Sequence, residues 1–358
     1  QFTNSVGEMP PATWSPTSTL LFSSFANATN ISGNSTWDQA YGNIVFNSPA
    51  QRAVVDFNGH IKSIKGNLSV QNTGKSILRL SNTSSYTLEL GEAEAADRGN
   101  VIVSGTARIH LGVSNTINAT IYGDFVVSAA NLNASYITST GTAVVNIYGD
   151  LRLTNSSARL RLGAGGSTGN SILNLYGDFI NQGGRLDETG DNPTQGTLNF
   201  VKNGTQTFSN QGVIVGRINY YIGPTTTLEV GNSLLSGSSP ATFTLEGTIV
   251  LGSLDSYGAI HSSANRGNIR TAPAYRTFAP GSTIVYGGAG EQFMSNGHPL
   301  NDEITTVIRN SSGVKLVANT TIAGTLNLDE GSLDLNGRTL TLTGIVASNG
   351  GFLAGTPT

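Results

Sequence analysis

Three aspartates recur at nearly constant spacing in the middle of the sequence, and carboxylates repeated in this way could do chemistry. Asp124, Asp150 and Asp178 each end a Tyr-Gly-Asp tripeptide, and they lie 26 and 28 residues apart. In a repeat structure such residues would fall on adjacent coils. Glycoside hydrolysis requires two carboxyl groups about 5 to 9 Å apart, and carboxylate oxygens also suit Ca²⁺. A catalytic pair and a cation site are therefore the first two hypotheses.

A structural role explains the same aspartates more simply. Asp directly after Gly at a turn commonly accepts backbone N–H bonds, and a residue repeated in every coil meets a need that every coil has. Stacked carboxylates would repel one another, and turn amides or a bound cation such as Ca²⁺ would neutralise them. We therefore expect turn residues, predict no catalytic residue, and keep Ca²⁺ as a hypothesis that a melt with chelator can test.

The remaining candidates for chemistry are isolated in the sequence. No histidine has the His-x-x-x-His or His-Glu context of a zinc site, and we interpret His298, in Asn-Gly-His-Pro, as a loop residue. The Gly-x-Ser-x-Gly match at 165–169 lacks the strand-to-helix context of a nucleophile elbow, and it lacks the Lys of a phosphate loop. Thr-rich stretches do not recur in every coil, so we expect ordinary exposed strand residues there rather than an ice-binding face. No cofactor is predicted. The other three histidines are His60, His110 and His261, and the Thr-rich stretches are Thr225–Thr227 and Thr339–Thr343.

Composition points to a strand-rich repeat protein. Charged residues make up 11% of the chain, against about 25% in typical globular proteins, whereas Gly numbers 45. Hydrophobic residues make up 37% and alternate with polar ones, which argues against disorder. The net charge is −3 and the Lys and Arg residues are scattered singly, so nucleic acid is not expected as a partner. No apolar run is long enough for a membrane span, and there is no cysteine.

Internal repeats decide the predicted fold. The clear units share an Ile or Leu, then Tyr-Gly-Asp, then an apolar residue; they are Ala119–Phe125, Val145–Leu151 and Leu173–Phe179. Partial copies occur at Tyr41-Gly42, Gly66–Leu68, Tyr257-Gly258 and Tyr286-Gly287. Near the C-terminus, Gly recurs at Gly324, Gly331, Gly337 and Gly344, with alternating Leu residues between. Each such Gly would supply the positive φ of a turn. Three of these legs make 20 residues, about one turn of a triangular β-helix.

The predicted fold is therefore all-β, a parallel β-helix or β-solenoid with about 20–28 residues per coil, and a right-handed coil is expected. A string of β-sandwiches is the alternative, but the Asn-Gly hairpin signals do not pair equal strands regularly. Residues 1–40, with their prolines and Trp14 and Trp37, are predicted to form a cap-like segment, followed by solenoid repeats over 41–358. Glu89–Arg98, of helical composition, is expected to be a loop excursion.

The order of these motifs resembles the repeat segments of large secreted surface proteins of the Bacteroidota, of the kind exported by the type IX secretion system. The resemblance runs through Pro11–Trp14, Tyr41–Asn47, Ile64–Val70, the Tyr-Gly-Asp units, Gly196–Phe200, Gly204–Phe208 and Gly324–Leu328. It implies adhesion or a structural spacer as the function. This chain departs from the family pattern because it stops at Gly355–Thr358 without a C-terminal sorting domain.

These observations predict a non-enzymatic extracellular β-solenoid at the cell surface: a stalk, an adhesin segment or a filament subunit. A start at Gln1 suggests a mature or trimmed product. Expected partners are further copies of the chain, through end-to-end or lateral assembly, or further repeats of a longer polypeptide, with surface glycans as another partner. The alternative function is a β-helix that binds or cleaves polysaccharides.

Overall fold

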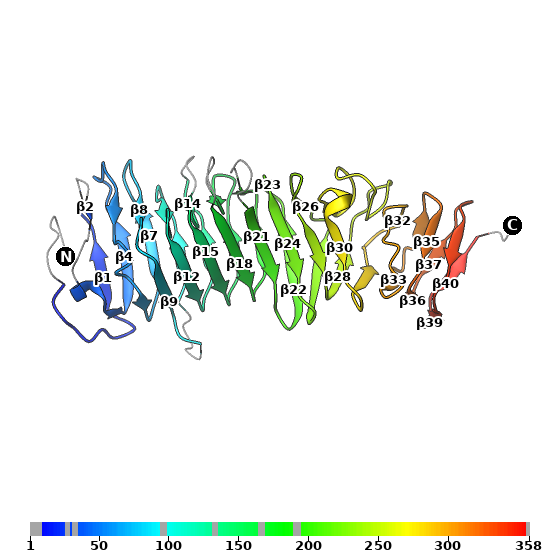
Figure 1. The fold of residues 1–358 in the computed structure, drawn as a ribbon, viewed down its shortest axis with the longest axis horizontal. Helices are drawn as coiled ribbons and strands as arrows, with labels where there is room; N and C mark the ends of the chain where they lie inside the picture. Colours follow the sequence, from blue (N-terminus) through cyan, green and yellow to red (C-terminus); the bar gives the residue numbers. More distant parts are fainter. Residues whose placement is uncertain are drawn as a thin grey trace. The chain divides into compact units, whose positions relative to one another are not determined.

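The computed structural model describes residues 9–25, 29–30, 35–93, 99–130, 135–163, 169–188 and 195–355. It confirms the predicted fold class, because strands from successive coils pair in parallel and stack into long sheets. Figure 1 shows these strands as successive aligned arrows within each part of the chain. Contacts divide the chain into two units: unit 1 comprises Gln1–Leu198 and Asn210–Arg217, and unit 2 comprises Asn199–Ser209 and Ile218–Thr358.

Unit 1 has three parallel sheets, and each coil adds one strand to each sheet. The first sheet contains β1 (Thr19–Phe22), β4 (Asn43–Asn47), β7 (Leu68–Asn72), β10 (Val101–Val103), β13 (Phe125–Val127), β16 (Leu151–Leu153) and β19 (Phe179–Asn181). The second contains β2 (Thr29–Asn30), β5 (Val55–Asp56), β8 (Leu78–Arg79), β11 (Ile109–His110), β14 (Ser135–Tyr136), β17 (Arg159–Arg161), β20 (Arg185–Asp187) and β23 (Val213–Val215). The third contains β3 (Ala40–Tyr41), β6 (Ser63–Ile64), β9 (Tyr86–Leu90), β12 (Thr116–Ile121), β15 (Thr142–Ile147), β18 (Asn170–Leu175) and β21 (Gln195–Phe200), which begins in unit 1.

Unit 2 also stacks its strands in parallel. Its longest sheet contains β22 (Gly204–Asn210), which begins in this unit, β25 (Thr226–Gly231), β28 (Thr248–Leu251), β31 (Thr283–Tyr286), β33 (Thr305–Arg309), β36 (Thr325–Glu330) and β39 (Val346–Ser348). A second group of paired strands contains β24 (Ile218–Ile222), β27 (Phe243–Leu245) and β30 (Arg276–Phe278), and a two-stranded sheet contains β26 (Leu235–Ser236) and β29 (Ile269–Arg270). A four-stranded sheet contains β32 (Gln292–Met294), β34 (Val314–Leu316), β37 (Ser332–Asp334) and β40 (Phe352–Ala354). A further two-stranded sheet contains β35 (Thr320–Ile322) and β38 (Leu340–Leu342). Two short 3₁₀ turns are described, η1 (Ser35–Trp37) and η2 (Pro273–Tyr275).

Coil length varies because corners accept insertions while strands do not. In unit 1, equivalent residues of successive coils lie 24, 33, 24, 26 and 28 residues apart. The long coil contains the Glu89–Arg98 stretch, of which Glu89 and Leu90 end β9, whereas residues 94–98 lie outside the described part. In unit 2 most coils are shorter, but Thr248 pairs with Thr283, 35 residues later. Two coils are thus longer than the predicted 28 residues.

The core lies inside the coils and is built by alternation along each strand. Around the Tyr-Gly-Asp units, the apolar residues on both sides of the tripeptide are fully buried: Ile121, Ile147, Leu175, Phe125, Leu151 and Phe179. Burying each such side chain contributes about 1.5–3 kcal/mol before the entropy cost of ordering. Equivalent residues stack from coil to coil, so the core is a set of apolar ladders.

Parallel pairing already begins inside residues 1–40, because β1 pairs in register with β4. Trp37 is 2% exposed and stacks on Phe22 with ring centroids 6.1 Å apart. The Gln39 side chain holds the preceding segment, since its amide donates to Pro10 O at 3.0 Å and its carbonyl accepts from Ala12 N at 3.1 Å. This segment is therefore attached to the first coils by aromatic packing and by one glutamine.

Candidate functional site

The three aspartates of the Tyr-Gly-Asp units lie at one corner of unit 1, each directly before a strand of the first sheet. The Asp150 backbone N–H donates to Asp124 Oδ1 at 2.8 Å, and the Asp178 N–H donates to Asp150 Oδ1 at 2.7 Å. The Asp124 and Asp150 carboxylates therefore each accept a backbone N–H, as predicted for a turn residue, but the N–H belongs to the next coil. The aspartates connect coils rather than close their own turns.

The same ladder extends into coils that lack the Tyr-Gly-Asp motif. Asn67 N–H donates to Asn43 Oδ1, and Asn100 N–H donates to Asn67 Oδ1, both at 2.8 Å. Asp124 N–H then donates to Asn100 Oδ1 at 2.7 Å. Asn and Asp are interchangeable here because both offer an acceptor oxygen at the same place. The repeated signal is thus Gly-Asn/Asp, which we call the Asn/Asp ladder: Asn43, Asn67, Asn100, Asp124, Asp150 and Asp178.

The glycine before each ladder residue is required for close packing. A Cβ on Gly149 would lie 2.3 Å from Asp124 Oδ1 and 2.4 Å from the backbone carbon of Gly123. The Tyr-Gly-Asp glycines, all in the described part of the chain, lie at bends but do not have positive φ, so close packing and not a left-handed backbone requires glycine there. Near the C-terminus, the sequence predicts positive φ for four glycines; the prediction holds for Gly331 and Gly337, whose φ values are +75° and +69°, and is wrong for Gly324 and Gly344.

The repulsion between stacked carboxylates is relieved by an arginine. Arg152 Nε lies 3.2 Å from Asp124 Oδ2, and Arg152 Nη2 contacts Asp150 Oδ2. The negative charge of the two carboxylates is therefore balanced by backbone N–H groups and by this guanidinium. The sequence by itself suggests turn amides or Ca²⁺ for this role. No cluster of three or more His, Asp or Glu residues arranged to hold a metal ion occurs in the described residues.

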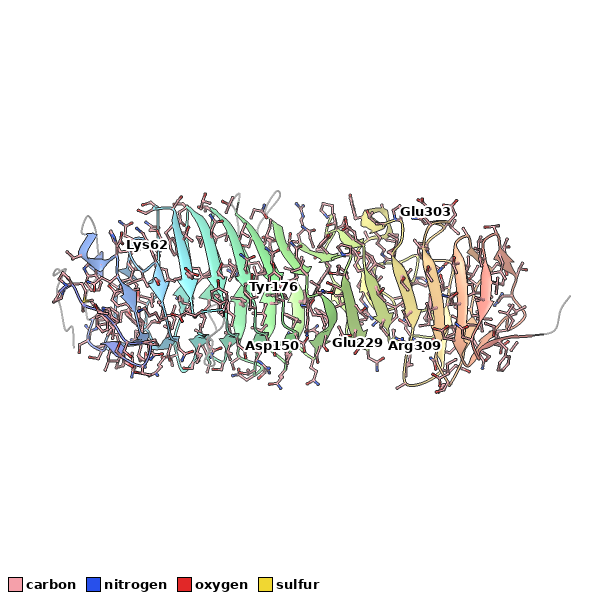
Figure 2. The ribbon with its side chains drawn as sticks, turned by 90° about the horizontal axis from the view of Figure 1, so that it is seen from below. Lys62, Asp150, Tyr176, Glu229, Glu303 and Arg309 are labelled. Atoms are coloured by element: carbon pink, nitrogen blue, oxygen red, sulfur yellow. The ribbon has the colours of Figure 1, made fainter. Side chains whose placement is uncertain are left out.

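The tyrosines of the repeat point outward, and only their apolar neighbours pack inward. Tyr122, Tyr148 and Tyr176 stack on one another, with ring centroids 5.3 and 4.4 Å apart and interplanar angles of 24° and 6°. Tyr148 is 38% exposed. Figure 2 labels Tyr176, which follows β18, and Asp150, which precedes β16. Because the rings stack face to face, they present mainly edges and hydroxyls, which makes the stack a coil-to-coil contact more than a platform for a planar ligand.

A groove of about 650 Å³ runs beside the Asn/Asp ladder. Its polar groups are engaged within the protein. The Asn43 amide donates to Pro16 O at 3.1 Å, the Asn100 amide donates to Asn67 Oδ1 at 3.1 Å, and Lys65 Nζ donates to Trp14 O at 3.2 Å. The groove therefore offers a ligand few groups that are not already bonded.

The histidines are dispersed, as their sequence context predicts. His60 Nδ1 lies 3.0 Å from Asp38 Oδ1, and His261 Nδ1 accepts from Ser263 N–H. His298 lies in a turn but is buried; its ring nitrogens bond to the Tyr286 hydroxyl at 3.2 Å and the Thr306 hydroxyl at 2.9 Å. Burial lowers the pKa of His298 to about 4. His110 differs from the other three histidines because it lies beside Arg79 and Tyr136, whose side chains could bind a ligand. The Gly165–Gly169 motif falls mostly outside the described residues.

Sequence reasoning missed a charged face on the outside of the second sheet. The ladder registers place Arg79 beside His110, His110 beside Tyr136, Tyr136 beside Arg161, and Arg161 beside Asp187. We call the charged and aromatic side chains on the outer side of this sheet, together with Arg108 directly before β11, the arginine face; they are Asp56, Arg79, Arg108, His110, Tyr136, Arg159, Arg161, Arg185 and Asp187. The only signal in the sequence was a weak excess of Arg in the second-sheet strands.

One end of the arginine face is organised around a fully buried carboxylate, Asp187. Arg159 donates to it through Nε at 2.9 Å and Nη2 at 2.6 Å, Arg161 Nε donates at 3.0 Å, and Arg185 Nε donates at 2.7 Å. Arg161 also donates to the Tyr136 hydroxyl at 2.6 Å, and its guanidinium carbon lies 5.0 Å from the centre of that ring. Three guanidinium groups thus share one carboxylate, which leaves the end strongly positive.

The other end holds polar atoms that have no hydrogen-bond partner. His110 is 6% exposed and packs edge-to-face on Tyr136 at 4.3 Å, yet neither ring nitrogen has a partner in the described structure. The Nε atoms of Arg79 and Arg108 are also buried without a partner there. Burial, together with the positive charges of Arg108, Arg79 and Arg161, lowers the pKa of His110 to about 3. A buried unpaired donor costs about 1–3 kcal/mol, so this arrangement needs an explanation.

Comparisons with known proteins identify no relative: no family model, no curated protein and no solved structure matches the chain. In the described residues, no helix is long and apolar enough to cross a membrane. What is established is the class of protein, a parallel β-solenoid with an Asn/Asp ladder at one corner of unit 1 and an arginine face on its second sheet.

Proposed function

We propose that the chain is a non-enzymatic structural or adhesive β-solenoid that acts as a stalk, an adhesin segment or a subunit of a cell-surface filament. The observation that carries this proposal is that the repeated polar residues bond to neighbouring coils of the protein itself. Asp124 and Asp150, the acids best placed for a catalytic pair, accept backbone N–H groups of the following coil and share Arg152. Their hydrogen-bonding capacity goes into coil stacking.

The proposed location is the extracellular cell surface. It is supported by the resemblance of the motifs to repeat segments of secreted Bacteroidota surface proteins, of which Tyr-Gly-Asp is the clearest. It is also supported by the absence of cysteine, since the fold is held by hydrogen-bonded ladders and apolar stacking. Detection of the native protein on intact cells with an antibody, before and after surface proteolysis, tests this part of the proposal.

The proposed partner is a further coil, either of a second copy or of a longer polypeptide. The last strands of unit 2 expose apolar side chains, with Ile345 71%, Val346 45%, Phe352 59% and Leu353 43% exposed. Within the described structure, β40 pairs only with β37, so its other edge offers backbone N–H and C=O groups. An added strand would pair with these groups and cover the apolar side chains.

Sedimentation velocity over a concentration series, with electron microscopy of the same samples, tests assembly through this coil. We expect end-to-end oligomers that grow with concentration and that shorten in the Val346→Ser/Phe352→Ser variant. The matched control is Tyr257→Ser/Leu300→Ser, which removes two exposed apolar side chains elsewhere in unit 2. Dispersed monomers at all concentrations would refute self-assembly.

The alternative function is polysaccharide binding or cleavage, and the arginine face favours the binding form. Incubation with a panel of acidic glycans, followed by chain-length analysis, separates the two activities. We expect no shortening of any glycan. Cleavage by the wild type that disappears in Asp124→Asn would overturn the non-enzymatic assignment.

A further inference from the structure

Positive charge is concentrated on the arginine face although the whole protein has a net charge of −3. The face carries five arginines and two aspartates, and His110 is neutral because its pKa is depressed. With Asp56 and Asp187 ionised, the net charge of the face is about three positive charges. An anionic partner is therefore attracted to this side of unit 1 in preference to the rest of the chain.

The arginine face also carries hydrogen-bond donors that have no partner in the described structure. The Nε atoms of Arg79 and Arg108 and the ring nitrogens of His110 are buried without partners among the described residues. His110 packs against Tyr136, and both arginines lie close enough to His110 for their charges to lower its pKa. A planar guanidinium binds carboxylate or sulfate oxygens through paired N–H bonds, and a neutral imidazole adds one more N–H donor. Because these atoms are buried, the Arg79 and Arg108 side chains must turn outward for an anionic group to accept the hydrogen bonds that the protein itself leaves unmade.

The face contains two such positive centres rather than one. Arg79 and Arg161 are three strands apart in the ladder, which is about 14 Å at a strand spacing of about 4.8 Å. Tyr136 lies between them, and Arg159 and Arg185 extend the second centre around Asp187. Anionic groups repeated along one extended chain would reach both centres at once, whereas a small ion would fill only one.

We propose that the arginine face binds a linear acidic polysaccharide, with one anionic group held by Arg79, Arg108 and His110 and another held by Arg159, Arg161 and Arg185. A nucleic acid fits less well, because single-stranded binding sites use aromatic faces on which bases stack. The Tyr136 ring instead already contacts the His110 ring and the Arg161 guanidinium. The inference rests on the adhesive role proposed above, but its binding assay is independent of the assembly assay, so either can fail alone.

Titration calorimetry of the whole chain with an oligogalacturonate long enough to span the face tests the proposal. A sulfated dextran oligosaccharide of similar length distinguishes sulfate from carboxylate as the preferred group. We expect binding that weakens as salt rises, because the contacts are charged and partly exposed. A neutral malto-oligosaccharide of equal length is expected not to bind.

The decisive variant is Arg79→Gln/Arg108→Gln, which we expect to weaken oligogalacturonate binding at least tenfold. Its matched control, Arg309→Gln/Arg338→Gln, removes two exposed arginines from unit 2 and is expected to bind as the wild type does (Figure 2 labels Arg309). Arg185→Gln, in which the changed side chain is 40% exposed, tests the second centre without disturbing the first. Circular dichroism and thermal melts confirm that each variant is folded.

Four results would overturn the inference: no binding of either acidic oligosaccharide, equal weakening in the unit 2 control, inorganic sulfate binding as tightly as the oligomer, or single-stranded DNA binding more tightly than the oligomer. If Arg79→Gln/Arg108→Gln does not fold, Arg79→Lys/Arg108→Lys replaces it. That variant keeps the charge but loses the planar donor pairs, and it is expected to bind several-fold more weakly. Unchanged binding in both it and Arg185→Gln would likewise refute the proposal.

Discussion

Replacement of Asp124 tests the Asn/Asp ladder most directly, because the chain itself supplies the matched control. Asp124 Oδ1 accepts the Asp150 N–H at 2.8 Å, and Oδ2 lies 3.2 Å from Arg152 Nε. Asp124→Ala removes both contacts. Asp124→Asn removes the charge but keeps an acceptor oxygen, as Asn43, Asn67 and Asn100 already do in earlier coils.

The two substitutions are expected to differ in their effect on the free energy of unfolding. A hydrogen bond to a charged group contributes about 1.5–3 kcal/mol, but the Asp124 side chain is 35% exposed, so solvent screening reduces this to about 1–2 kcal/mol. The Arg152 pair, also partly exposed, contributes about 0–1 kcal/mol. Asp124→Ala should therefore destabilise by about 1–3 kcal/mol, and Asp124→Asn by less than about 1 kcal/mol.

Urea unfolding followed by circular dichroism measures both values, and calorimetry should show the same order of melting temperatures. Arg152→Gln provides a third variant, because it removes the ion pair and leaves the ladder oxygen in place. Equal losses in Asp124→Ala and Asp124→Asn would show that the acceptor oxygen contributes nothing. The ladder would then be a consequence of coil stacking and not a cause of it.

Four further outcomes are expected from unfolding measurements. Gly149→Ala should cost about 2 kcal/mol or more, since its Cβ would meet backbone at 2.4 Å, whereas Gly290→Ala, next to a flexible leucine side chain at 3.3 Å, should cost less. Tyr148→Ala should cost about 1 kcal/mol through loss of two ring contacts, and Tyr148→Phe should cost almost nothing. Asp187→Asn should cost about 3–5 kcal/mol, because three guanidinium groups lose their shared charge. Stability should fall as pH drops from about 6.5 towards 4, because His298 and His110 have folded pKa values of about 4 and about 3 against about 6.5 when unfolded, so each takes up a proton on unfolding in that range; His298→Asn should make this fall shallower.

Each of these expectations can fail in a distinct way. Equal losses in the two glycine variants would show that the coils can move apart at little cost. If Tyr148→Phe lost as much stability as Tyr148→Ala, the hydroxyl and not the stacked ring would be the group that matters. An unchanged stability of Asp187→Asn would indicate that the three arginines are stabilised by solvent. An unchanged pH profile in His298→Asn would show that His298 contributes nothing to the fall and that His110 accounts for it.

Much of the fold could be predicted from local patterns. Alternation in stretches such as Gly324–Gly344 predicts strands with one apolar face, and the recurrence of Tyr-Gly-Asp at near-constant spacing predicts stacked coils. Both follow from the period-two geometry of strands, which requires no knowledge of distant residues. Insertions at corners are harder to anticipate, because they change the spacing without changing the ladder, as the pairing of Thr248 with Thr283 shows.

The sequence by itself thus determined the parallel coils, the inward apolar ladders and the structural use of the Gly-Asp corner. The tertiary structure alone decided which residues become neighbours across coils. It turned the repeat tyrosines outward, gave the ladder residues from Asn43 to Asp150 an N–H from the next coil, and brought scattered arginines such as Arg79, Arg108 and Arg161 onto one face. The physical reason is that stacking places residues a whole coil apart in sequence at the strand spacing of about 4.8 Å, so a face can be charged although no stretch of the sequence is.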